Sequence, residues 1–278
     1  MRDHSRRFSD FTLVYPVISR RARGLSLGIN VNPDKVCNFD CIYCEVNRTE
    51  PGVSLKVDAA RIKEELTALI QLIRNGGLNR QSKFSSAGEL TREIRDIAFS
   101  GEGEPTLIPN FAECVQAVVD VKRAEGLSAT KIVLITNAVG LDKADVRRGL
   151  ELMDAHEGEI WGKLDAGTET YYKLVNRSHV RFERILKNLL QTARLRPIVI
   201  QTLFLKVHDQ MMPPAELEAY CARLKELVQA GAQIKEVHAY TVARATPEDY
   251  ATALSGTELA ALAETIRRNT RLPVFEFP

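Results

Sequence analysis

The stretch Cys37-Asn-Phe-Asp-Cys41-Ile-Tyr-Cys44 places three cysteines within eight residues. Three thiolates at this spacing can converge on one inorganic centre. A cubane iron–sulfur cluster usually takes four cysteines, one for each iron, and no fourth cysteine lies nearby in the sequence. One iron would therefore keep an open position, where a ligand can be bound and activated as at a catalytic metal site. The alternative is a structural zinc ion that takes its fourth ligand from a remote histidine, such as His208 or His238.

The composition is that of an ordinary soluble globular protein. The chain has 278 residues, of which 45% are hydrophobic and 27% are charged, and its formal net charge is +2. This charge argues neither for nor against a polyanionic partner. No run of about 18 apolar residues is present, so we expect no membrane span. The first residues also lack the apolar core of a secretory signal.

Cysteine usage favours a reducing compartment. Besides the three clustered cysteines, Cys114 and Cys221 stand alone in helix-like segments. A disulfide framework would space its cysteines differently, so we expect a cytoplasmic protein. Cys114 and Cys221 are expected to be buried small hydrophobic side chains.

Apolar, β-branched runs alternate with amphipathic stretches along the chain. The runs predict strands at 25–31, 94–99, 131–136, 160–164, 198–205 and 234–242. The stretches predict helices at 57–73, 111–123, 143–153, 182–195, 214–229 and 256–269, and 273–277 reads as a further short strand. Six β-then-α units imply parallel strands with right-handed crossovers. They are too few for the usual closed barrel, so the predicted fold is a partial (β/α)6 TIM-like barrel with a mostly parallel sheet.

A glycine-rich turn, Ser100-Gly-Glu-Gly-Glu-Pro105, follows the second predicted strand, just as the cysteine loop follows the first. In barrels of this kind the active site lies at the C-terminal ends of the strands. Both segments are therefore expected on the same face of the molecule.

Together, the cysteine motif and the order of elements resemble the radical S-adenosylmethionine (radical SAM) superfamily over residues 25–245. The signature of that family is Cys-x3-Cys-x-aromatic-Cys, and Tyr43 fills the aromatic position. The resemblance implies one [4Fe–4S] cluster on Cys37, Cys41 and Cys44, whose open iron chelates the amino and carboxylate groups of S-adenosylmethionine. One electron then breaks the sulfur–C5′ bond, and the 5′-deoxyadenosyl radical abstracts a hydrogen atom from the substrate.

The resemblance also assigns cofactor contacts to the glycine-rich turn. The family carries a Gly-Gly-Glu-Pro-like turn that holds the amino group of S-adenosylmethionine, and the match assigns this role to Gly103 and Glu104 and leaves Glu102 unassigned. The chemistry agrees, because glycine permits close backbone approach to a ligand and a carboxylate suits an ammonium group.

Four further positions are carried over from the family. Lys163 and Asp165, at the end of the fourth predicted strand, and Asn137, at the end of the third, are expected to contact the carboxylate and ribose of the cofactor. Tyr43 is expected to cover its adenine. The alternatives are an internal ion pair between Lys163 and Asp165 and plain packing for Tyr43.

Within the superfamily, the two motifs look most like the molybdopterin-precursor cyclases and the wyosine synthases of transfer RNA. The cyclases bind a second cluster through C-terminal cysteines and end in Gly-Gly, whereas this chain has no such cysteines and ends in Phe-Glu-Phe-Pro. The wyosine synthases carry another cysteine set before the first strand, and no cysteine precedes Cys37 here. Neither specific activity is therefore transferred.

No stretch rich in Pro, Gly or Ser divides the chain. Residues 1–24 are interpreted as a basic N-terminal extension, 25–245 as the radical SAM (β/α)6 core, and 246–278 as a C-terminal helix and short strand packed on that core. The basic run at 20–23 is either solvated charge or a phosphate or nucleic-acid contact.

The sequence thus predicts a radical SAM enzyme with an unidentified substrate and an external electron donor of the flavodoxin or ferredoxin type. A small or medium-sized substrate is favoured over RNA, because no RNA-binding module is visible, and it is expected near His208 and Arg244. The alternatives are a tRNA base-modifying enzyme of the wyosine-synthase type, and a non-catalytic iron–sulfur or zinc protein that binds a partner through residues 20–23.

Overall fold

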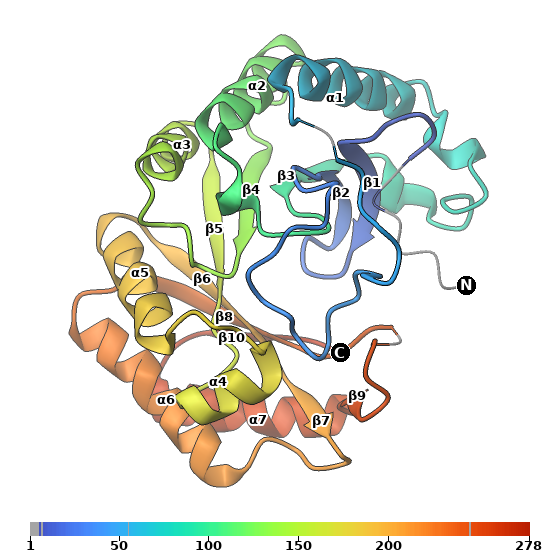
Figure 1. The fold of residues 1–278 in the computed structure, drawn as a ribbon. Helices are drawn as coiled ribbons and strands as arrows, with labels where there is room; N and C mark the ends of the chain where they lie inside the picture. The colour runs from blue at the N-terminus through green and yellow to red at the C-terminus, as the bar shows by residue number, and fades with distance from the viewer. Residues whose placement is uncertain (1–5, 7, 55, 245) are drawn as a thin grey trace.

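A mostly parallel sheet curled into a half-barrel forms the centre of the computed structural model, which describes residues 6, 8–54, 56–244 and 246–278 (Figure 1). Its strands, in spatial order, are β1 (Val14–Ser19), β2 (Gly24–Ile29), β3 (Ile94–Phe99), β4 (Lys131–Thr136), β5 (Gly158–Lys163), β6 (Ile198–Leu203), β8 (Ile234–Tyr240) and β10 (Val274–Phe277). All neighbouring pairs from β2 to β10 are parallel, and β1 is antiparallel to β2. The predicted partial (β/α)6 barrel is confirmed, and the last short strand completes one edge as β10.

Helices cover the outside of the curved sheet and link its strands (Figure 1). They are α1 (Ala59–Arg74), α2 (Phe111–Ala124), α3 (Ala144–Asp154), α5 (Phe182–Leu195), α6 (Pro214–Gln229) and α7 (Gly256–Thr270). A shorter helix, α4 (Glu169–Asn176), was not predicted from the sequence. None of the helices in the described ranges combines the length and apolar character needed to cross a membrane.

Short elements fill the connections. Two 3-10 turns, η1 (Leu78–Arg80) and η2 (Gly88–Thr91), lie between α1 and β3, and a third, η3 (Pro105–Leu107), follows the glycine-rich turn. An antiparallel ribbon joins β7 (Leu205–Val207) to β9 (Ala251–Ala253). The two isolated cysteines, Cys114 on α2 and Cys221 on α6, are buried as predicted.

The two faces of the sheet are filled differently. Toward the helices, alternate strand residues such as Leu25, Leu27 and Ile29 are fully buried in one large apolar cluster. Toward the inside of the half-barrel the apolar cluster is small and consists of Ala98, Val133, Trp161 and Val199, with Ile135 packed against them. The outer face therefore supplies most of the hydrophobic stabilisation, and the inner face is left for polar side chains and a cavity.

The strand β1 lies in the segment interpreted as an N-terminal extension, and a buried carboxylate on α1 holds it to the domain. The Glu65 carboxylate accepts hydrogen bonds from the backbone N–H groups of Thr12, Leu13 and Val14 at 2.7–3.0 Å. Arg61, one helical turn earlier, pairs with the same carboxylate at 2.7 Å. The start of β1 is therefore anchored through a charge-assisted network rather than through apolar packing alone.

We expect Glu65→Ala to lower the free energy of unfolding by about 3 kcal/mol, because three backbone donors, two of them buried, lose their acceptor. Urea denaturation followed by circular dichroism measures this change. Glu64→Ala, at an exposed position on the same helix, is the matched control and should shift stability by less than about 0.5 kcal/mol. Equal effects from the two variants would show that Glu65 does not anchor β1.

Candidate active site

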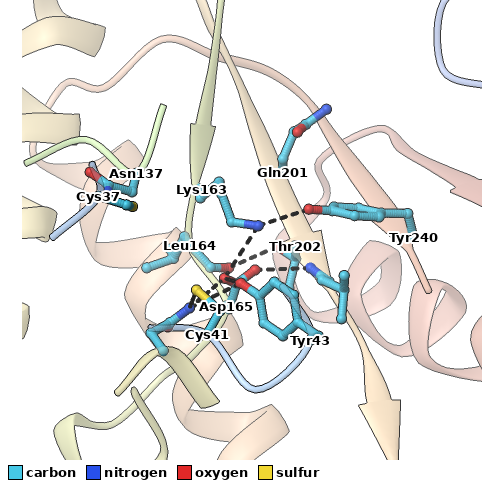
Figure 2. Close-up of polar contacts among 12 residues, drawn as sticks. Cys37, Cys41, Tyr43, Asn137, Lys163, Leu164, Asp165, Gln201, Thr202 and Tyr240 are labelled. Carbon is cyan, nitrogen blue, oxygen red and sulfur yellow. Dashed lines mark hydrogen bonds and ion pairs between the residues drawn. The ribbon is translucent and has the colours of Figure 1, made fainter. Parts of the chain in front are cut away.

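A cavity of about 520 Å³ lies inside the half-barrel and reaches the C-terminal ends of the strands. Most of the residues predicted for the site line it, namely Cys37, Cys41, Tyr43, Cys44, Gly103, Glu104, Asn137 and Lys163. Asp165 is buried next to this wall and contacts Tyr43 and Lys163 (Figure 2). The fold thus brings together side chains from the loops after β2, β3, β4 and β5, and the volume suits a small-molecule or cofactor site.

Each sulfur of the cysteine loop has a side-chain N–H donor beside it. Asn137 Nδ2 lies 3.8 Å from Cys37 Sγ, Asn176 Nδ2 lies 3.4 Å from Cys41 Sγ, and Arg48 Nη2 lies 3.9 Å from Cys44 Sγ. No three His, Cys, Asp or Glu side chains of the described residues are arranged to hold a single metal ion. A four-iron cluster takes one thiolate per iron, so its three thiolates need not converge on one point.

Surrounding protein atoms shield the thiols of Cys37 and Cys41 from solvent. Burial raises the pKa of Cys37 to about 11 and the pKa of Cys41 to about 12. A metal centre that binds here must displace the thiol protons, and its own positive charge favours that displacement.

The glycine-rich turn packs directly on the cysteine loop. The Glu104 N–H donates to the Val36 carbonyl at 3.1 Å, and a Cβ at Gly103 would clash with that carbonyl oxygen and with the Asn32 side chain. Buried Asn30, at the start of the cysteine loop, bonds both the backbone N–H and the carboxylate of Glu102. Glycine at 103 is thus required by packing between the two loops, and the two sequence motifs form one structural unit.

The two oxygens of the buried Glu104 carboxylate accept different numbers of hydrogen bonds. Its Oε1 accepts from Thr106 N at 3.1 Å, Thr106 Oγ1 at 2.6 Å and Thr136 Oγ1 at 2.5 Å. Among the described residues its Oε2 accepts only from Asn137 N, at 2.7 Å. Burial raises the pKa of Glu104, against the opposite effect of these hydrogen bonds. Since a carboxylate oxygen accepts two hydrogen bonds, Oε2 has room for one more donor, such as an ammonium group.

A second buried carboxylate, Asp165, joins four segments of the chain. Its Oδ2 accepts from the Tyr43 hydroxyl and, at 2.9 Å, from Asn176 Nδ2, and its Oδ1 accepts from Leu203 N at 2.9 Å. Lys163 Nζ lies 3.7 Å from the same carboxylate (Figure 2). The ion pair considered from the sequence is therefore present, and it leaves the Lys163 ammonium on the cavity wall.

Aromatic rings flank Lys163. Its Nζ donates to the Tyr240 hydroxyl at 2.9 Å and lies 4.7 Å from the centroid of the Tyr43 ring. Burial alone would lower the pKa of Lys163, but the Asp165 carboxylate and the Tyr240 hydroxyl outweigh it, and the pKa is raised. The side chain is thus held as a cation in a fixed place.

Several residues of the site were not singled out in the sequence. Asn176 is the last residue of α4, and one amide group serves Cys41, Tyr43 and Asp165. Nothing in its local sequence marks this role, because the contacts with Cys41 and Tyr43 reach across 135 and 133 residues. Tyr240, at the end of β8, could have been found as a polar aromatic that closes a predicted strand.

The two substrate candidates from the sequence are separated by the fold. Arg244 lines the cavity, 3.4 Å from Glu45 Oε2. His208 is exposed, stacks on Tyr250 and does not line this cavity. The basic run contributes instead, because Arg20 and Arg21, in the turn between β1 and β2, reach the cavity wall.

Comparison by sequence finds relatives of modest similarity. The chain is 27% identical over 184 residues to a UPF0026 protein of Helicobacter pylori, covering 65% of this chain and 51% of that protein. It is 29% identical over 178 residues to a UPF0026 protein of Methanocaldococcus jannaschii, covering 63% of this chain and 47% of that protein. It is 26% identical over 182 residues to the GTPase Obg of Brachyspira hyodysenteriae, covering 65% of this chain but only 23% of that protein. The chain therefore spans about half or less of the length of these relatives. No protein-family model matches it.

Comparison by structure finds the same architecture in solved proteins. SuiB of Streptococcus suis, solved bound to S-adenosylmethionine, superposes with a TM-score of 0.60 at 13% identity, over 93% of this chain and 52% of that one. TYW1, solved with a lysine-pyruvate adduct, superposes with a TM-score of 0.55 at 19% identity, over 90% of this chain and 74% of that one. At these identities the likeness concerns the fold. The chain has the fold of the radical SAM enzymes, as the resemblance in its motifs predicted.

Proposed function

We propose that this protein is a radical SAM enzyme that holds one [4Fe–4S] cluster on Cys37, Cys41 and Cys44 and binds S-adenosylmethionine beside it. One observation carries the proposal. The cysteine loop and the glycine-rich turn line the same cavity, and a hydrogen bond from Glu104 N to the Val36 carbonyl joins them. The fold, shared with radical SAM enzymes, supports it.

The residues present fit such a cluster. Three thiols line one cavity, each with an N–H donor near its sulfur, and hydrogen bonds to sulfur together with burial are the means by which proteins tune cluster potentials. When bound, the cluster supplies the electron that cleaves S-adenosylmethionine to a 5′-deoxyadenosyl radical. The chain's part is to hold the thiolates, exclude water and orient the cofactor.

The cofactor contacts follow from the donors and acceptors on the cavity wall. Glu104 Oε2 accepts from the amino group, and the backbone at Gly103 lies alongside it. Lys163 and Asn137 face the carboxylate and ribose. Tyr43 presents its ring to the adenine. Asp165 was expected from the resemblance to contact the cofactor itself, but it does not line the cavity, and its proposed role is to fix Tyr43 and Lys163 in place.

The electron comes from an external donor of the flavodoxin or ferredoxin type, and a reducing cytoplasm suits the free thiols. The substrate is a small molecule rather than RNA. The arginines near the site gather around one cavity and its rim instead of forming a stripe on the outer surface, which is the usual footprint of a nucleic-acid partner.

Anaerobically purified protein is expected to contain about four irons and four sulfides per chain, and to bleach in air. Cys41→Ala should abolish the visible absorbance, because one iron loses its ligand. Cys221→Ala, at a buried cysteine on α6, is the control and should retain it. Iron analysis and absorption spectra measure both. Stoichiometric zinc without visible absorbance would instead establish the structural-metal alternative.

The reduced protein is expected to form 5′-deoxyadenosine from S-adenosylmethionine in the presence of dithionite. Glu104→Gln should weaken S-adenosylmethionine binding roughly ten- to hundredfold, the equivalent of a charged hydrogen bond of ~1.5–3 kcal/mol. Isothermal titration calorimetry measures the affinity, and a thermal melt without cofactor checks the fold.

Glu102→Gln is the matched control, since the Glu102 carboxylate is bonded to Asn30 and lies half-buried at the same turn. If Glu102→Gln weakens binding and Glu104→Gln does not, the amino-group site has been assigned to the wrong glutamate. A cluster that never yields 5′-deoxyadenosine would point to a non-catalytic iron–sulfur protein.

A further inference from the structure

Three arginines gather at one end of the cavity. Arg20 and Arg21 come from the turn between β1 and β2, and Arg244 comes from the segment after β8. Arg21 is half-buried, and Arg20 and Arg244 lie at the exposed rim. The proposed cofactor contacts do not use any of the three.

Arg21 is fixed by neutral groups. Its Nη1 donates to Gln201 Oε1 at 2.8 Å, and its guanidinium carbon lies 4.9 Å from the centroid of the Tyr240 ring and 5.5 Å from that of Trp161. Gln201 is fully buried on β6, so it orients the guanidinium without neutralising its charge. A guanidinium has five N–H donors, and this bond engages one nitrogen.

The three arginines differ in their acceptors. Arg20 donates to an oxygen of Pro278, the last residue of the described chain, and to the Thr241 carbonyl oxygen, whereas Arg21 forms no ion pair with a carboxylate among the described residues. Glu45 lies 3.4 Å from Arg244. Asp96, which lines the same cavity, is bonded to Ser26, and the charge of Arg21 opposes the rise that burial causes in the pKa of Asp96. Burial and the neighbouring Arg21 lower the pKa of Arg20, and Glu45 acts against them.

The same end holds donors that lack acceptors. Gln201 Nε2 is buried and has no hydrogen-bond partner in the described part of the chain. Together with the guanidinium nitrogens of Arg21 that no described residue engages, it leaves several N–H donors in this region without an acceptor. Such a set complements the oxygens of a phosphate or carboxylate group, which guanidiniums bind through paired hydrogen bonds.

We propose that Arg20, Arg21 and Arg244 bind a phosphate or carboxylate group of a small-molecule substrate. Tyr240 contacts Lys163 (Figure 2) and also Arg21, so a substrate held by its anionic group lies one aromatic ring away from the proposed cofactor contacts. The arginines then fix which part of the substrate faces the radical. This inference rests on the proposed function for the role of the ligand, but the anion site itself can be tested without any turnover.

The test is isothermal titration calorimetry of the anaerobically purified protein with two probes, inorganic phosphate and succinate, at matched ionic strength with chloride as reference. We expect saturable binding of at least one probe, and the tighter probe identifies the group that the site prefers. Arg21→Gln, and separately Arg20→Gln combined with Arg244→Gln, should weaken it at least tenfold. Arg92→Gln, at an exposed arginine paired with Glu89, is the control and should leave it unchanged.

Absence of saturable binding by both probes, or binding that survives both sets of substitutions, overturns the inference. A second titration with saturating S-adenosylmethionine present should give the same affinity. Competition would assign the arginines to the cofactor carboxylate rather than to the substrate. Bulk transfer RNA that binds below micromolar at ~200 mM salt, beyond the usual non-specific range, and loses that affinity in the arginine variants, would overturn the small-molecule assignment.

The two proposals fail separately. Saturable anion binding by a preparation that forms no 5′-deoxyadenosine rejects the radical SAM activity and leaves the anion site standing. Formation of 5′-deoxyadenosine by a preparation that binds neither probe rejects the anion site alone.

Discussion

The buried carboxylate of Asp165 is the interaction on which the arrangement of the site depends. Taking a carboxylate out of water costs several kcal/mol unless hydrogen bonds and an opposite charge replace the solvent. That replacement comes from Tyr43 of the cysteine loop, Asn176 of α4, the backbone of Leu203 at the end of β6, and Lys163 of β5. Because the carboxylate is stable only when these partners are in place, it fixes the positions of the cysteine loop, the fourth helix and two strands relative to one another.

Glu104 works in the same way on the other side of the cavity. Its hydrogen bonds tie the glycine-rich turn to Thr136 and Asn137, at the end of β4, and through its backbone to the cysteine loop. The cavity is therefore walled by loops that are held by polar networks, while the apolar packing that stabilises the fold lies on the opposite face of the sheet. This division lets the inner wall carry charged side chains without weakening the core.

The sequence was sufficient to predict the six βα units, because their strands are buried apolar runs and their helices have a clear apolar period. It was not sufficient for β1, which carries Pro16 and lies at the edge of the sheet, where a missing N–H is tolerated. The anchor of β1, Glu65, lies about 50 residues away, so no local pattern reveals it. The short helix α4 was missed because its 8 residues give too few turns for periodicity to be read.

The two loops of the site could be predicted because each is marked by a short local motif. The residues that hold the site in place from other parts of the chain could not be predicted. Asn176 and Gln201 act through contacts made across 133 and 180 residues, and only the fold brings them together. In the same way, the sequence left open whether Arg20 and Arg21 are solvated charge or a phosphate or nucleic-acid contact, and only the fold shows that the turn that carries them reaches the cavity.

The packing of Gly103 and Glu104 against the carbonyl of Val36 has a consequence for engineering. If only one of the two loops were replaced by a loop from another protein, the Val36 carbonyl and the Glu104 N–H would no longer be in register. Neither loop would then keep its position. Chimeras built to borrow this pair of loops should therefore exchange residues 30–44 and 100–107 as one module. Within such a module the backbone bond from Glu104 to Val36 keeps the two loops together, while Thr136, Asn137 and Asp165 of the barrel still have to match it.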